Sequence, residues 1–200
     1  KYQCPVMIVA DGMICQMMEP VVLPEMKEYK VDLEKKPWAA NGHGFSKKAG
    51  RTIINSMYIQ TEDLTVHNEN LQAIYREIEA NEVRYEAYNM ENAEIVVTAF
   101  GTVARIAKSA IDELKEEGVN VGMIRPITLW PFPTKELHDA AMAEGVKAVL
   151  DVELNAGQML EDVKLAINGE KPVDFFGHYG SQMPTPEEIK AKLLSMREVL

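Results

Sequence analysis

The stretch IVVTAFGTVARIAKSAIDELKEEGVNVGMI, residues 95–124, decides the fold of this chain. Residues 95–100 are almost all apolar and are followed by Gly101, which is typical of a buried strand that ends in a turn. Residues 119–124 form a second short apolar run of the same kind. Between the two runs, apolar side chains recur at helical spacing up to Gly118, namely Val103, Ala107, Ala110, Ile111 and Leu114. The stretch therefore predicts a strand–helix–strand unit.

The same alternation continues to the carboxyl end of the chain. Residues 148–152 and 172–176 predict two more strands. Helices are expected with Thr134 as an N-cap, over residues 158–167 and after the capping box of Thr185-Pro186-Glu187-Glu188. Strands and helices that alternate in this way favour an α/β fold, with a small parallel sheet, helices on both faces and right-handed crossovers.

The amino-terminal half is less regular. Residues 5–10, PVMIVA, predict a buried strand, and because such a strand pairs on both sides, we expect the rest of its sheet to precede this chain. Residues 13–19 predict a short Met-rich helix, and residues 21–56 have the composition of a connecting segment. A long helix is expected over residues 62–88, with Thr61 as its N-cap.

Composition excludes several classes of function. The chain has 200 residues, of which 46% are hydrophobic, enough for one domain and a smaller addition. Its 21 Lys and Arg against 31 Asp and Glu give a net charge of -10, which would repel nucleic acid and anionic membranes. No apolar run reaches the roughly 18–20 residues that span a bilayer, so we expect a soluble cytoplasmic protein. Cys4 and Cys15 are too few for an iron–sulfur cluster.

Residues with catalytic potential are scattered. Gly101-Thr102 could hold an anion, but without further glycines at phosphate-loop spacing, a plain turn with Thr102 as N-cap is favoured. A hydrolase elbow of the form Gly-x-Ser-x-Gly is missing from the sequence. The 4 histidines are not spaced for zinc: His43, His67, His138 and His178. We therefore expect no catalytic, cofactor-binding or metal residue in this chain.

Two segments carry more large side chains than their length can bury. Residues 11–20 are rich in methionine, and residues 125–133, RPITLWPFP, combine aromatic rings with prolines that hold the backbone rigid. Either segment could cover the chain's own core, or it could contact another subunit. As interface residues, and as the basis of an expected homo-oligomer, we select Met13, Met17, Met18, Arg125, Trp130 and Phe132.

Taken together, these segments resemble the alpha subunit of the thiamine-diphosphate-dependent 2-oxoacid:ferredoxin oxidoreductases. Within that family the sequence is most similar to subunits that act on branched-chain 2-oxoacids such as 2-oxoisovalerate. The resemblance covers nearly the whole chain. It lies in PVMIVADG (5–12), QMMEPV (16–21), AFGTVAR (99–105), IRPITLWPFP (124–133), ELNAGQM (153–159) and PTPEEI (184–189).

The resemblance implies three parts. Residues 1–20 would be the end of a truncated pyrimidine-binding domain, residues 21–91 a linker with a long helix, and residues 92–200 a transketolase-like carboxy-terminal domain. The acidic residue that activates the cofactor in this family lies upstream, so no catalytic residue is carried over. Two positions depart from the family pattern, because Cys15 stands where Gly is usual and His178 where Arg is more usual.

The resemblance also implies a reaction, the oxidative decarboxylation of a 2-oxoacid with coenzyme A and reduction of ferredoxin. Thiamine diphosphate, magnesium and iron–sulfur clusters would belong to the complete enzyme, which includes a thiamine-diphosphate-binding beta subunit and a ferredoxin-like subunit. The present chain alone would be inactive, bind none of these cofactors and serve subunit assembly. Two alternatives stay open: a non-enzymatic α/β binding or scaffolding module, and a thiamine enzyme with a different electron acceptor.

Overall fold

The computed structural model describes residues 1–18, 20–27, 36, 38–39, 54–180 and 182–200. These residues form two compact units. One unit joins Lys1–Met17 to Tyr75–Leu200 and contains the sheet, and the other is Met18–Ile74.

A five-stranded sheet with strand order β1-β3-β2-β4-β5 forms the centre of the first unit. The last four strands of the chain run parallel, whereas β1 pairs antiparallel with β3 at the edge. In the central register, Ile95 lies opposite Val121 on one side and Ala148 on the other. The strands are β1 (Tyr85–Tyr88), β2 (Ile95–Thr98), β3 (Val121–Pro126), β4 (Ala148–Glu153) and β5 (Val173–Gly177).

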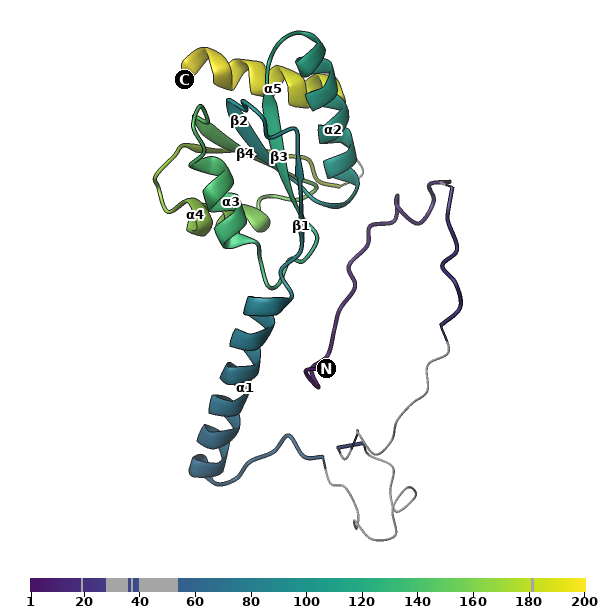
Figure 1. The fold of residues 1–200 in the computed structure, drawn as a ribbon, viewed down its shortest axis with the longest axis vertical. Helices are drawn as coiled ribbons and strands as arrows, with labels where there is room; N and C mark the ends of the chain where they lie inside the picture. Colours follow the sequence, from purple (N-terminus) through teal and green to yellow (C-terminus); the bar gives the residue numbers. More distant parts are fainter. Residues whose placement is uncertain (19, 28–35, 37, 40–53, 181) are drawn as a thin grey trace. The chain divides into compact units, whose positions relative to one another are not determined.

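Helices cover both faces of this sheet, as the sequence predicts (Figure 1). The predicted apolar face of α2 is buried, with Val103 2% exposed and Leu114 0% exposed. The predicted capping box of α5 is also present, since Thr185 and Glu188 each accept a backbone hydrogen bond from the other. One face carries α2 (Gly101–Glu116) and α5 (Pro186–Val199), and the other carries α3 (Thr134–Ala141) and α4 (Met159–Ile167).

The prediction of one helix over residues 62–88 is wrong beyond its first part. Helix α1 is Thr61–Asn81, starting at Thr61 itself, and the chain then enters strand β1. Strand β1 forms because it pairs with β3, where Glu86 lies opposite Arg125 and bonds to its guanidinium. Such pairing between distant segments overrides local helix propensity.

The amino-terminal predictions also need correction. Residues 5–10 pair with no strand in the described part of the chain, and their side chains are exposed, Ile8 by 92%. In place of a helix over residues 13–19 there is a single turn, in which Gln16 N and Met17 N reach Met13 O at 2.9 and 3.1 Å. One turn costs backbone entropy for few hydrogen bonds, so a helix does not propagate from it. Residue 19 and most of the predicted connecting segment lie outside the described residues.

The second unit contains most of α1 and the residues before it. Tyr58 stacks on His67, with ring centroids 4.7 Å apart and a hydrogen bond of 3.2 Å between Tyr58 Oη and His67 Nδ1. This contact holds the approach to α1 against its first turns.

Candidate functional site

The candidate site lies at the carboxyl ends of β2 and β4. The chain passes from β2 to β3, which lies on one side of β2, and then from β3 to β4, which lies on the other side of β2. The boundary between β2 and β4 is therefore a topological switch point. Open α/β sheets bind ligands at such points. Two cavities, of 150 and 190 Å³, lie at this edge and share Phe100, Glu153 and Asn155 in their walls.

Glu153, the last residue of β4, caps helix α4. Its carboxylate accepts hydrogen bonds from Met159 N and Leu160 N, both at 3.0 Å, and from Asn155 Nδ2 at 2.9 Å. The Asn155 side chain in turn accepts from two backbone N–H groups of the same loop, including that of Gly157 at 2.8 Å. The segment 153–159 is thus a self-contained cap, and a carboxylate at a helix amino terminus is also favoured by the helix dipole.

Helix α2 is capped by a residue from the other end of the unit. Asp11 Oδ2 accepts hydrogen bonds from Thr102 Oγ1 at 2.7 Å and Thr102 N at 3.3 Å. The backbone N–H of Ile14, which bonds the other oxygen, and these Thr102 donors lower the pKa of Asp11. The predicted turn at Gly101 is present with φ +61°, but Thr102 is not the N-cap, because it lies inside the helix.

These two caps decide which ligands the switch point can take. The amino termini of α2 and α4 are the places where a phosphate group would gain from backbone N–H groups and the helix dipole. Each already holds a carboxylate of the chain, from Asp11 and Glu153 respectively. The arrangement therefore does not favour a phosphate-bearing cofactor at this edge.

Asp151 is a buried acid on the same face of β4 as Glu153. It is 0% exposed, and no donor among the described residues reaches either carboxyl oxygen. Its neighbour across the β2–β4 pairing is Thr98, whose buried hydroxyl also has no partner among them. Burial, reinforced by the neighbouring Glu153, raises the pKa of Asp151 to about 9. At neutral pH this carboxyl is protonated and can donate to Glu153, so the pair carries a single negative charge.

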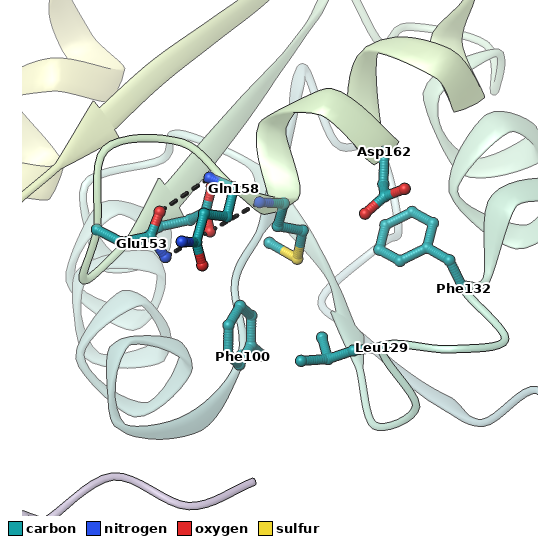
Figure 2. Close-up of a pocket in the computed structure, with 8 residues that line it drawn as sticks. Phe100, Leu129, Phe132, Glu153, Gln158 and Asp162 are labelled. Atoms are coloured by element: carbon teal, nitrogen blue, oxygen red, sulfur yellow. Dashed lines mark hydrogen bonds between the residues drawn. The ribbon is translucent and has the colours of Figure 1, made fainter. Parts of the chain in front are cut away.

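The 150 Å³ cavity has apolar walls and an acidic rim (Figure 2). In Figure 2 the Asp162 carboxylate lies beside the Phe132 ring, with Phe100 and Leu129 on the other side of the opening. Asp162 is exposed, and partial desolvation together with the charges of Glu161 and Glu153 raises its pKa. No Lys, Arg or His is among the described residues that line the cavity: Phe100, Leu129, Phe132, Glu153, Asn155, Gln158, Met159 and Asp162.

The residues selected from sequence as an interface lie in two places. In the loop after β3, Trp130 is 56% exposed and packs edge to face on Tyr75, with centroids 5.6 Å apart. Phe132 is half-buried and lines the cavity, while Arg125 bonds to Glu86 at 3.0 Å within the sheet. The methionines of the amino-terminal segment are exposed: Met13 by 45%, Met17 by 42% and Met18 by 99%.

Sequence reasoning did not select the acids that organise this edge. Asp151 and Glu153 could have been found as two acids at alternate positions of an otherwise apolar strand, which places both on one buried face. Nothing local marks Asp11 as a cap, because its partner Thr102 is 91 positions away.

Metal ligands do not cluster in the part of the chain that the structure describes. No group of three or more His, Cys, Asp or Glu side chains there is arranged to hold a metal ion. Cys4 is half-buried and Cys15 exposed, and neither forms a disulfide. Within the same residues, every helix is too short or too polar to cross a lipid bilayer.

Comparison with known proteins agrees with this fold. Residues 93–189 match the family model of pyruvate:ferredoxin oxidoreductase core domain II. Over 194 residues, 96% of its length, the chain is 38% identical to the ketoisovalerate oxidoreductase subunit VorB of Methanothermobacter marburgensis, of which it covers 53%. These matches support a 2-oxoacid:ferredoxin oxidoreductase subunit. The family recognised from sequence is thereby confirmed.

Other members of this oxidoreductase family are more distant. The chain is 28% identical over 213 residues to the 2-oxoglutarate synthase subunit KorA of Methanocaldococcus jannaschii, covering 97% of the chain and 57% of the relative. The chain thus spans only a little more than half of these relatives. A solved 2-oxoglutarate:ferredoxin oxidoreductase from Magnetococcus marinus superposes with a TM-score of 0.57 at 19% identity, covering 73% of this chain and 25% of that one. The superposition confirms the α/β fold class.

Proposed function

We propose that this chain is part of a subunit of an oxidoreductase that decarboxylates a branched-chain 2-oxoacid and reduces ferredoxin. The 38% identity to a ketoisovalerate oxidoreductase subunit, spread over 96% of the chain, carries the proposal. In the proposed reaction the carbon–carbon bond to the carboxylate breaks and a carbon–sulfur bond to coenzyme A forms. The products are an acyl-CoA, carbon dioxide, a proton and two electrons, which pass to ferredoxin.

The cofactors of such an enzyme would be bound by its other subunits. Thiamine diphosphate, magnesium and iron–sulfur clusters do not fit the described residues of this chain. Its two thiols belong to a half-buried and an exposed cysteine outside any ligand cluster, and both helix amino termini at the switch point hold carboxylates. A thiamine-diphosphate-binding beta subunit and a ferredoxin-like subunit are therefore the partners that the proposal requires.

The proposed contribution of this region is subunit assembly. It is supported by large apolar side chains that stay exposed, with Trp130 56% and Met18 99% accessible. Exposed apolar surface of this kind is typical of contacts with another chain. Residues 1–20 are proposed as the end of a pyrimidine-binding domain, residues 21–91 as a linker, and residues 92–200 as the carboxy-terminal domain.

The test is an activity measurement on the enzyme that contains this chain, purified with its partner subunits under anaerobic conditions. Coenzyme A-dependent reduction of ferredoxin is measured with 2-oxoisovalerate, 2-oxoglutarate and pyruvate in parallel. We expect kcat/KM to be highest for 2-oxoisovalerate. Equal or higher values for the other two acids would overturn the branched-chain assignment, and no reduction with any of them would overturn the proposed reaction.

A further inference from the structure

We propose that the 150 Å³ cavity lined by Phe100, Phe132 and Asp162 receives a Lys or Arg side chain from a partner protein. We call this cavity the acidic socket. The inference rests on the proposed function in one respect, because it assumes a partner subunit, and it adds the chemistry by which that partner is recognised.

The charge of the acidic socket is unbalanced within the described chain. Two carboxylates, Glu153 and Asp162, line it together with no basic side chain. Glu153 is bonded to the α4 amino terminus, but Asp162 accepts no hydrogen bond from any described residue. Asp162 is an exposed residue at the rim, and partial desolvation together with the nearby charges of Glu161 and Glu153 raises its pKa. A cation placed beside Asp162 would reverse this unfavourable potential.

The size and walls of the acidic socket suit a long basic side chain. Small-molecule sites usually occupy roughly 300–1,000 Å³, so a cavity of 150 Å³ is small for a substrate or cofactor. Phe100, Leu129 and Met159 offer an apolar wall for the methylene stem of Lys or Arg. The rings of Phe100 and Phe132 can also face the charged head, which adds a cation–π attraction.

The rim of the acidic socket favours a protein over a free ammonium ion. Its loop exposes Ile127 by 55%, Leu129 by 38% and Trp130 by 56%, enough apolar surface to pack against neighbours of the inserted side chain. A second copy of this chain is the less suitable occupant of an acidic cavity, because the chain itself has a net charge of -10. The partner is therefore a different protein with a basic residue among apolar ones.

The first experiment uses a blocked peptide, Leu-Arg-Leu, and its norleucine analogue, in which the charged head is absent. Binding to the chain is followed by the NMR shift of the Met159 methyl group, which lines the acidic socket. We expect the arginine peptide to bind at least tenfold more tightly than the analogue. Asp162→Asn should weaken its binding at least fivefold, while the matched control Glu161→Gln, which changes an adjacent acid outside the lining, should alter it less than twofold.

The second experiment measures association with the purified partner subunits. Asp162→Arg should weaken assembly at least tenfold, and Glu161→Arg should not. Absence of binding by the arginine peptide, equal binding of the two peptides, or equal effects of the two positions would each overturn the acidic socket. If the Asp162→Arg enzyme assembles and oxidises 2-oxoisovalerate normally, the acidic socket fails while the proposed function stands. If the unmodified enzyme oxidises no 2-oxoacid, the proposed function fails while the peptide result is unaffected.

Discussion

Replacing Asp151 with Asn should remove a loss of stability at alkaline pH. In the folded chain the pKa of Asp151 is raised from 3.8 to about 9, first by burial and then by Glu153. Between these pH values the folded state binds one proton more than the unfolded state at this position. The free energy of unfolding therefore falls as pH rises, by about 1.4 kcal/mol per pH unit, or about 2.7 kcal/mol from pH 6 to pH 8.

Asn has nearly the same shape, cannot ionise and keeps a donor for Glu153, so the contribution of this position to the slope disappears. The Asp151→Asn chain should gain stability over the unmodified chain steadily between pH 6 and pH 8. Urea unfolding at several pH values in this range measures the difference in the free energy of unfolding. Any effect of histidine titration on that free energy is common to both chains and drops out of the difference. Asp139→Asn is the control, since Asp139 is exposed and its pKa is lowered by Lys135, so it is ionised in both states. Parallel pH profiles for Asp151→Asn and the unmodified chain would refute a protonated Asp151.

Three further predictions concern the caps and the exposed segments. Asp11→Ala should destabilise the unit by about 1 kcal/mol through loss of a helix cap, and hydrogen exchange should become faster at the first turn of α2. Because the pKa of Asp11 is lowered, the contribution of the cap to stability is present at neutral pH and is lost as the carboxyl protonates in acid. Unchanged exchange there would contradict the cap. Gly101→Val should lower the melting temperature, since φ is +61° and a β-branched residue in that conformation costs about 1–3 kcal/mol; an unaltered melting temperature would show that the turn relaxes. If Met17 and Trp130 anchor a two-fold dimer, the double substitution Met17→Ser and Trp130→Asp should weaken self-association by several kcal/mol in analytical ultracentrifugation, whereas a monomer at every concentration of the unmodified chain would rule the dimer out.

The sequence was sufficient wherever structure follows from local periodicity. The buried stripe of α2 is visible in the spacing of Val103, Ala107 and Leu114, because a helix returns to the same face every 3.6 residues. The capping box of α5 is local as well, since Thr185 and Glu188 bond to each other within one turn. Strands between such helices leave few arrangements other than a parallel sheet covered on both faces.

The candidate site was only partly accessible in the same way. The turn at Gly101 and the unusual loop around Trp130 stand out in the sequence, but the cavity beside them does not. Its walls come from the ends of separate strands and helices, so they meet only when the sheet has formed. Asp162 looks like any acid in the first turn of a helix until Phe132 is seen to lie beside it.

By itself, the sequence determined the order and type of the elements from residue 92 onward and the family that the chain resembles. Only the tertiary structure decided that residues 85–88 form an edge strand, that Asp11 caps α2, and that Asp151 is buried beside Glu153 with a raised pKa. The physical reason is the range of the interactions. Helical spacing and caps are set within a few residues, whereas strand pairing, a cap from 91 positions away and the desolvation of a carboxyl depend on which distant residues the fold brings together.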